Sequence, residues 1–167
     1  MGILKKIGYK VSFLIKIMEY KISYGNRFQI GNNLAFRKRF SVNISKNGNL
    51  KIGNDVFFND DCSLNCKLDI NVGDDCIFGQ NVKIYDHNHS FSDYLKPIRK
   101  QGYSLKPVKI GDNCWIGSNV VILPGTIIGS NSIIGAGSVI SGEIPEGVIV
   151  TSERELQFVR RRVNGNE

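Results

Sequence analysis

From Ile110 onward, the hydrophobic positions of the chain repeat every six residues without a gap. Isoleucine begins each unit of six, here called a hexad, at Ile110, Ile116, Ile122, Ile128, Ile134 and Ile140. The period excludes an α-helix, because six is not a multiple of 3.6 and the apolar face would rotate away. Polar pairs inside each hexad exclude a two-residue alternation. The pattern therefore predicts short strands joined by tight turns, with Gly or Asn in backbone conformations that β-branched residues disfavour.

The same frame occurs earlier in the chain, with interruptions and a faint first copy at Ile30. Three hexads make one triangular coil, and coils stack into a solenoid. We therefore expect an all-β solenoid of about five coils with three columns of inward side chains. These columns are Ile52, Val72, Ile110 and Ile128; Phe58, Phe78, Ile116 and Ile134; and Leu64, Ile84, Ile122 and Ile140. Cys62, Cys76 and Cys114 fall at the fifth hexad position, which predicts reduced thiols in the core.

A second apolar pattern lies at the N-terminus and predicts an amphipathic basic helix over residues 1–24. Apolar residues recur there at spacings of three and four, at Leu4, Ile7, Val11, Leu14, Met18 and Ile22. Residues 1–40 hold nine basic residues and one acidic residue, so the rest of this chain of net charge +7 is nearly neutral. A neutral body argues against nucleic-acid binding. The stripe is expected either to contact an anionic membrane surface or to pack on the domain or a neighbouring subunit.

These patterns divide the 167 residues into three parts. The helix at 1–24 is followed by the solenoid at 25–150, with a loop inserted at 90–109, and by a basic segment at 151–167. No signal peptide is visible, and no apolar run approaches the ~20 residues that span a bilayer. We therefore expect a cytoplasmic protein, with the helix favouring the inner face of a membrane.

The inserted loop carries the candidate chemistry, because both histidines of the chain, His87 and His89, lie at its root. Long loops in compact domains are disproportionately functional. An imidazole can take a proton from a hydroxyl that attacks a thioester, and fixed backbone N–H groups can stabilise the oxyanion. His89 is the first choice for this base and His87 the second. The alternative is that the imidazoles only form hydrogen bonds at the base of the loop.

Two segments on either side of the loop carry a family resemblance. Asn81-Val-Lys-Ile-Tyr-Asp-His-Asn-His-Ser-Phe91 and Pro107-Val-Lys-Ile-Gly-Asp-Asn-Cys-Trp-Ile-Gly-Ser-Asn-Val-Val-Ile-Leu-Pro-Gly125 resemble the hexapeptide-repeat acetyltransferases. The similarity extends to capsule- and lipopolysaccharide-modifying enzymes and to galactoside and maltose O-acetyltransferases. It implies a left-handed parallel β-helix, a homotrimer, acetyl-CoA as co-substrate, no metal, and a hydroxyl of a sugar or cell-surface glycan precursor as acceptor.

The resemblance also implies roles for single residues. His89 matches the catalytic base, and Asn59 matches an asparagine that contacts the acceptor or the oxyanion. The acetyl-CoA contacts implied are Trp115, Gly117, Ser118, Gly135 and Ala136, with Arg160 and Arg161 near the 3′-phosphate. The family's closing Gly-Asn-Pro-Ala turn is missing after Gly147, which weakens the assignment of the two arginines. A core or trimer-contact role is the alternative for Trp115, and the repeat itself is the alternative for the small residues.

Residue type alone points to acceptor contacts in the loop, at Tyr94, Lys96, Arg99 and Tyr103. Three other functions use a similar solenoid. A sugar-nucleotide N-acetyltransferase would differ in its acceptor amine, and a non-catalytic β-helix interaction module would use the hexads as scaffold only. A carbonic anhydrase on this fold needs three histidine ligands for zinc, whereas the chain has two histidines.

Overall fold

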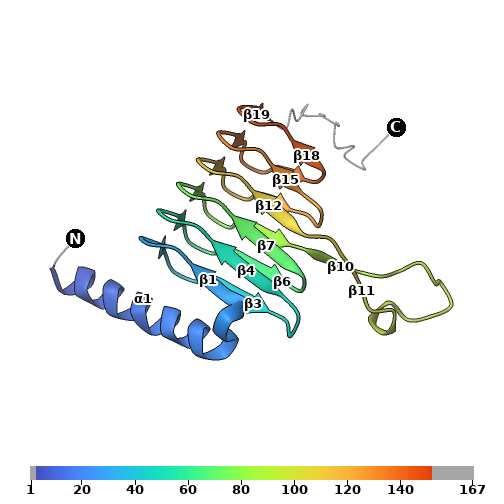
Figure 1. Cartoon of the computed structure of the whole chain (residues 1–167), viewed down its shortest axis with the longest axis horizontal. Coiled ribbons are helices and arrows are strands. Elements are labelled where there is room, and N and C mark those ends of the chain that lie inside the picture. The colour runs from blue at the N-terminus through green and yellow to red at the C-terminus, as the bar shows by residue number, and fades with distance from the viewer. Residues whose placement is uncertain (1–2, 152–167) are drawn as a thin grey trace, which may run out of the picture.

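The computed structural model describes residues 3–151, with side chains from Ser12 onward. The chain forms a parallel β-solenoid, and an N-terminal helix packs against its first coil (Figure 1). The helix α1 (Ile3–Tyr24) leads through the 3₁₀ turn η1 (Gly25–Arg27) into the first coil. The fold class is the left-handed parallel β-helix that the resemblance implied.

Each full coil contributes one strand to each of three parallel sheets. Sheet 1 contains β1 (Phe28–Ile30), β4 (Asn49–Ile52), β7 (Asp69–Val72), β12 (Val108–Ile110), β15 (Ile127–Ile128) and β18 (Glu143–Ile144). Sheet 2 contains β2 (Ala35–Phe36), β5 (Phe57–Phe58), β8 (Ile77–Phe78), β13 (Trp115–Ile116), β16 (Ile133–Ile134) and β19 (Ile149–Val150). Sheet 3 contains β3 (Ser41–Ile44), β6 (Ser63–Cys66), β9 (Lys83–Tyr85), β14 (Val121–Ile122) and β17 (Val139–Ile140).

The solenoid has about six coils, so the prediction of about five was one short. The additional coil is the last one, where Ile144 pairs with Ile128 and Val150 pairs with Ile134. The hexad frame after Ile140 places the next inward residue at position 146, but the inward residue is Ile144. Gly142, with a φ of 81°, makes this turn shorter than the earlier ones. The frame therefore slips by two residues at a point where the sequence shows no interruption.

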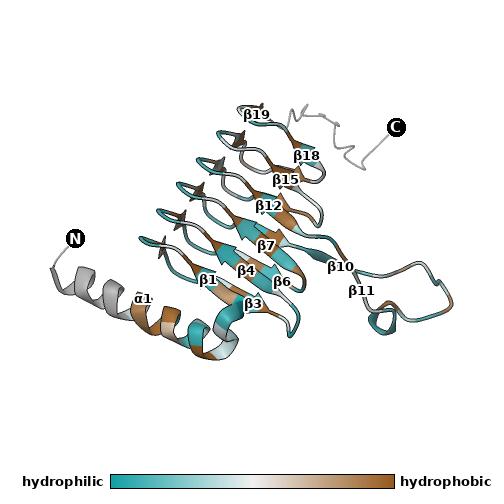
Figure 2. Ribbon diagram, in the orientation of Figure 1, coloured by the Kyte–Doolittle hydropathy of each residue, from teal (hydrophilic) through white to brown (hydrophobic). Residues whose placement is uncertain are grey.

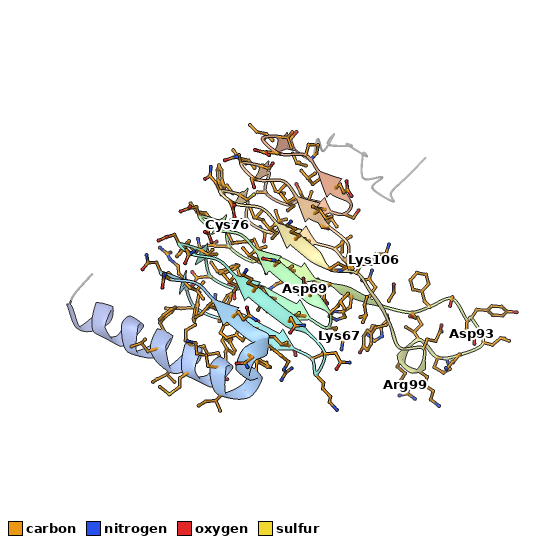
Figure 3. The ribbon with its side chains drawn as sticks, in the orientation of Figure 1. Lys67, Asp69, Cys76, Asp93, Arg99 and Lys106 are labelled. Atoms are coloured by element: carbon orange, nitrogen blue, oxygen red, sulfur yellow. The ribbon has the colours of Figure 1, made fainter. Side chains whose placement is uncertain are left out.

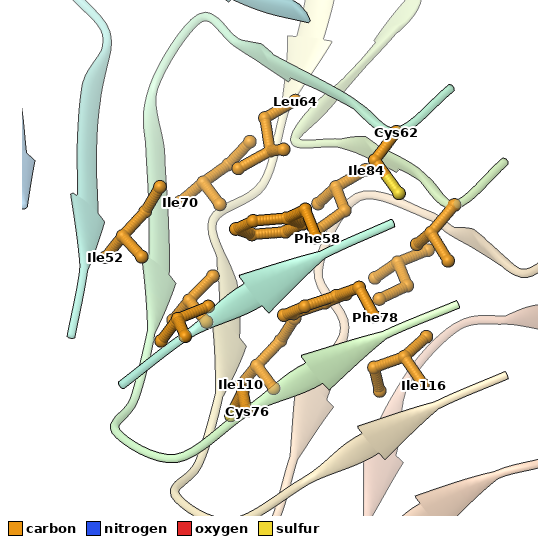
Figure 4. Packing of buried hydrophobic residues seen from close by; sticks show 14 of the residues in the cluster. Ile52, Phe58, Cys62, Leu64, Ile70, Cys76, Phe78, Ile84, Ile110 and Ile116 are labelled. Atoms are coloured by element: carbon orange, nitrogen blue, oxygen red, sulfur yellow. The ribbon is translucent and has the colours of Figure 1, made fainter. Parts of the chain in front are cut away.

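The three predicted inward columns are confirmed. Their members pair in register from coil to coil and are all buried. At the centre, the rings of Phe58 and Phe78 stack with centroids 4.3 Å apart (Figure 4). Cys62, Cys76 and Cys114 are buried core residues, as expected. Burial raises the pKa of the Cys62 thiol, which is the behaviour of an inert core cysteine.

Replacing Phe78 with alanine is expected to destabilise the protein by about 3–5 kcal/mol, because the cavity would lie between two stacked coils. The matched control is Ile77→Ala, since Ile77 precedes it on β8 with its side chain 52% exposed. The unfolding midpoints of both variants in urea measure the difference. Equal midpoints would contradict the inward column.

The helix α1 packs on the first coil through a face that the sequence analysis did not identify. The Tyr20 hydroxyl donates to the Phe40 carbonyl oxygen at 3.2 Å, and the Tyr24 hydroxyl donates to that of Val42 at 3.0 Å. The rings of Phe13 and Phe36 lie 4.7 Å apart. This second face has the same spacing of three and four residues as the predicted stripe but lies on another side of the helix.

The predicted stripe itself does not pack on its own domain. Of its described members, Leu14, Met18 and Ile22 are exposed. The expectation that the stripe covers the domain is therefore wrong, because the aromatic face occupies that place. No helix within residues 3–151 is long and apolar enough to cross a membrane.

Candidate active site

The inserted loop leaves the solenoid as a β-hairpin where sheet 3 turns into sheet 1, here called the 3–1 corner (Figure 1). Strand β10 (His87–His89) pairs antiparallel with β11 (Tyr103–Leu105), so that His87 lies opposite Leu105 and His89 opposite Tyr103. A 3₁₀ turn, η2 (Ile98–Lys100), lies farther out. At the corner where sheet 1 turns into sheet 2, equivalent residues of successive regular coils are 18 positions apart in the sequence, as Asp112 and Ser130 are. Asp74 and Asp112 are 38 positions apart because the hairpin lies between them.

His89 lines a cleft of about 410 Å³ between the hairpin and the solenoid. The cleft is lined by Asn88, His89, Ser90, Phe91, Ser92, Ser104, Lys106 and Pro124. The His89 ring lies tilted against Tyr103, with centroids 4.6 Å apart. Pro124 comes from the 3–1 corner of the next coil, so the imidazole has the fixed solenoid on one side and the hairpin on the other.

Asp86, which the sequence analysis missed, anchors the root of the hairpin. Its carboxylate is fully buried. It accepts hydrogen bonds from the backbone N–H groups of Lys67 (2.9 Å), Leu68 (2.7 Å) and Asp69 (2.9 Å) in the coil before. Burial, together with this carboxylate, raises the pKa of the neighbouring Cys66 thiol to about 12. One side chain therefore ties two coils together at the point where the hairpin leaves.

The same carboxylate also orients His87. Nδ1 of His87 lies 2.9 Å from Oδ1 of Asp86, and because an ionised carboxylate can only accept, this hydrogen bond needs a proton on Nδ1. The ring meets Tyr85 and Tyr103 edge-on, with centroids 6.2 and 5.5 Å away. His87 therefore forms a hydrogen bond at the base of the loop, which is the role that the alternative interpretation gave to the histidines.

Tyr103 is the predicted acceptor contact that the structure brings to the histidines. Its ring touches both imidazoles, and the Lys67 ammonium lies 4.0 Å from its centroid. The cation therefore faces the ring from the solenoid side, close to the cleft.

The other predicted acceptor contacts lie away from the histidines. Tyr94 is 92% exposed, and Lys96 and Arg99 are also exposed. Figure 3 places Arg99 far out on the loop, whereas Lys67 and Lys106 lie near its root. The structure does not bring Tyr94, Lys96 or Arg99 together with His89.

Asn59 lies at a different corner of the triangle, where sheet 2 turns into sheet 3. The backbone at this 2–3 corner forms a column in which Asn59 N–H donates to Phe78 O, and Gly79 N–H to Ile116 O. The side-chain Oδ1 of Asn59 accepts the N–H of Asp60 at 2.9 Å. One chain therefore does not bring the two predicted catalytic residues, His89 and Asn59, together.

The small residues predicted to contact acetyl-CoA continue this column two and three coils above Asn59. A side chain at Gly117 would place its Cβ 2.6 Å from the Ala136 nitrogen, and one at Gly135 would lie 2.9 Å from the Val150 oxygen. Ser118 Oγ accepts the Gln80 N–H at 3.1 Å. Coil stacking alone requires these glycines, so their presence does not identify a ligand.

Comparisons with known proteins show which proteins the chain is similar to. The family described as bacterial transferase hexapeptide (six repeats) matches residues 107–142. The galactoside O-acetyltransferase of Lactococcus lactis is 35% identical over 83% of this chain and 65% of its own length. A putative lipopolysaccharide biosynthesis O-acetyl transferase of Escherichia coli, WbbJ, is 32% identical over 57% of this chain and 55% of its own.

A solved structure agrees with these relatives. The hexapeptide-repeat acetyltransferase of Vibrio cholerae complexed with acetyl coenzyme A superposes with a TM-score of 0.66 at 27% identity, covering 79% of this chain and 70% of that one. Residues 107–142 of the chain therefore carry the repeat of the bacterial hexapeptide-repeat transferases. The chain spans 33% to 65% of the length of the curated relatives that it matches first.

Trp115 is not a core residue. It points outward from β13 and is 55% exposed, between Ile77 and Ile133 of the neighbouring coils. A core role is therefore wrong, while a contact with acetyl-CoA or with a neighbouring subunit stays a prediction. Arg160 and Arg161 lie outside the described residues.

The described part of the chain, residues 3–151, contains no group of three or more His, Cys, Asp or Glu side chains arranged to hold a metal ion. The functional groups at the hairpin root are the two imidazoles, the buried Asp86 carboxylate and the phenol of Tyr103.

Proposed function

We propose that this transferase is an acetyl-CoA-dependent O-acetyltransferase that acts on a hydroxyl of a sugar or cell-surface glycan precursor. The observation that carries the proposal is the His89 imidazole, which lines a cleft at the root of the inserted hairpin. The relatives named as galactoside and lipopolysaccharide O-acetyltransferases support the acceptor class. The acetyl coenzyme A complex of the Vibrio cholerae protein supports the donor.

His89 would act as a general base. Its imidazole takes the proton of the acceptor hydroxyl as the oxygen attacks the thioester carbonyl carbon of acetyl-CoA. The tetrahedral intermediate then collapses with cleavage of the C–S bond, and the CoA thiolate takes the proton from the imidazolium. Backbone N–H groups and the Asn59 amide would stabilise the oxyanion. No covalent acyl-enzyme is required.

The separation of the predicted site residues supports a homotrimer with shared sites. His89 lies at the 3–1 corner and Asn59 at the 2–3 corner, so a site that uses both needs two chains side by side. Trp115 and the column at Gly117 would then line the acetyl-CoA channel between subunits.

Subunit complementation tests this arrangement. Trimers reassembled from a mixture of His89→Ala and Asn59→Ala chains are expected to regain activity that neither variant has alone, because some interfaces would combine an intact His89 with an intact Asn59. Each variant reassembled by itself is the control. If the mixture stays as inactive as its components, the shared site is wrong.

A CoA-release assay tests the activity itself. The full chain is incubated with acetyl-CoA and a panel of sugars, nucleotide sugars and oligosaccharides, and the free thiol is followed with time. The proposal expects release that depends on a hydroxyl acceptor. If no acceptor in the panel raises the rate of thiol release above the rate in buffer alone, the proposal is contradicted.

We also propose that the enzyme is cytoplasmic and reaches the inner face of a membrane through residues 1–24. The basic character of this end of the chain supports the contact, since residues 1–40 carry nine of the 22 basic residues and one acidic residue.

A further inference from the structure

The outer face of α1 presents an apolar stripe that is exposed among the described residues. Leu14, Ile15, Met18 and Ile22 are 61%, 61%, 62% and 78% exposed, although the opposite face of the helix is packed on the first coil. Their spacing puts them on one side of the helix, and the sequence continues the pattern toward the N-terminus. Figure 2 shows apolar and polar residues alternating along the described part of α1. A contiguous apolar stripe of this kind marks an interaction surface.

A cationic groove adjoins this stripe. It has a volume of about 650 Å³ and lies between α1 and the first coil, lined by Ser12, Ile15, Lys16, Phe36, Arg37, Lys38, Arg39 and Phe40. Ile15 belongs to both the stripe and the groove, so the two surfaces are continuous.

The groove carries a net positive charge after its ion pairs are taken into account. Lys16 is paired with Glu19, and Arg39 with Asp61. Among the described side chains, neither Arg37 nor Lys38 makes an ion pair. The Arg37 guanidinium lies over the Phe57 ring, 5.8 Å from its centroid. The Asp60 carboxylate accepts the backbone N–H of Lys38 at 2.8 Å and forms no ion pair with the Lys38 ammonium.

We propose that the stripe and the groove together form a docking surface for an anionic lipid bilayer. The apolar side chains would enter the boundary between headgroups and acyl chains, and Arg37 and Lys38 would contact lipid phosphates. The inference deepens the membrane contact of the proposed function by assigning it to one helix face and to two cations of the first coil. It does not depend on the acetyl-transfer reaction.

Charge favours a bilayer over a second copy of the chain that meets the stripe with its own stripe. Such a pair would bring together two segments with nine basic residues and one acidic residue each. Like charges at such an interface repel, whereas anionic headgroups would neutralise them.

This orientation would stand the solenoid on the membrane by its first coil. The hairpin leaves from the third coil, and stacked strands are separated by about 4.8 Å, so its root would lie roughly 10 Å above the first coil. The cleft at His89 would then be within reach of an acceptor held at the membrane surface.

Sedimentation with lipid vesicles tests the docking surface. The full chain is mixed with phosphatidylcholine vesicles or with vesicles that also contain phosphatidylglycerol, and the bound fraction is measured. We expect partition into the anionic vesicles to exceed that into the neutral ones by roughly tenfold or more, and to fall with salt. Equal partition into both, or none into either, would overturn the proposal.

Two variants separate the parts of the surface. The stripe variant Leu14→Gln, Met18→Gln, Ile22→Gln keeps good helix formers and is expected to lower partition roughly tenfold or more. Unchanged partition would overturn the proposal. A change in oligomer mass by light scattering, with no vesicle binding by the unchanged chain, would assign the stripe to a second copy and also overturn it.

The charge variant Arg37→Glu, Lys38→Glu leaves the helix intact and is expected to lower partition roughly tenfold or more. Its matched control is Lys51→Glu, Lys109→Glu, which makes the same change in net charge at two exposed positions of sheet 1. Equal losses in both variants would mean that net charge alone acts, and the groove would have no role. CoA release with a soluble acceptor should be unchanged in all these variants, so a failure of docking is distinguishable from a failure of the proposed enzyme.

Discussion

Replacing His89 with alanine is expected to lower the rate of acetyl transfer by roughly 10²–10⁴-fold, the usual contribution of a general base. The fold should survive, because the His89 side chain is exposed and makes only a ring contact with Tyr103 among the described residues. Steady-state CoA release and the thermal unfolding midpoint, measured on the same preparation, check both parts of this expectation.

His87→Ala is the informative companion to that variant. His87 is held by Asp86 and does not line the cleft, so its loss should act on the hairpin root more than on the chemical step. If His89→Ala kept most of its activity while His87→Ala lost it, the base would be His87. That result would also give Asp86 the role of orienting the catalytic ring.

Replacing Asp86 with alanine is expected to destabilise the protein by about 3–5 kcal/mol, because the N–H groups of Lys67, Leu68 and Asp69 would all lose the fully buried carboxylate that they share. For a chain of this size the unfolding midpoint should fall by about 10 °C or more. The loss should appear in differential scanning calorimetry of the protein without any substrate.

Asp74→Ala is the matched control, because Asp74 also accepts a backbone N–H, from Asn54 at 2.7 Å, but at a corner that is partly open to solvent. Water can replace the lost acceptor there, so the midpoint should fall much less. Similar losses in the two variants would mean that Asp86 is one more corner residue and no special anchor of the hairpin.

The solenoid could be predicted from the sequence because each position of its repeat requires a particular type of residue. Each inward position of the columns starting at Ile52, Phe58 and Leu64 needs an aliphatic or aromatic side chain, and the tight turns need Asn, Asp or Gly. The corner residues Asn81, Asn113 and Asn131 have φ values of 58°, 52° and 60°, in the left-handed region that asparagine tolerates. The missed sixth coil follows a turn at Gly142 that is shorter than the repeat.

The packing face of the helix could not be predicted from periodicity. The helix contains two apolar faces with the same spacing, and spacing alone does not indicate which of them the domain covers. The face with Tyr20 and Tyr24 packs inward because two hydroxyls find backbone carbonyl partners on the first coil. The more regular aliphatic stripe stays outside.

The candidate site was predicted in part. The insertion and the two histidines at its root are where the sequence placed them, although the root forms a β-hairpin that the sequence did not predict, and Tyr103 joins the histidines. Asp86 could not be singled out, because an aspartate after a strand also occurs at exposed corners such as Asp61 and Asp75. Only the fold shows that its carboxylate turns inward toward the preceding coil. The separation of His89 and Asn59 likewise became visible only in the fold, because it depends on which corner of the triangular coil each residue occupies.

The most direct test of the central proposal is the identity of the product. The full chain and its His89→Ala variant are incubated with acetyl-CoA and an acceptor from the sugar panel, and the products are analysed by mass spectrometry before and after mild alkali. We expect the unchanged chain to form an acetylated sugar whose acetyl group alkali removes as an ester, and the variant to form almost none. An acetyl group that resists alkali would mark an amide product, and an equal yield from the variant would show that His89 is not the base; either result would contradict this account.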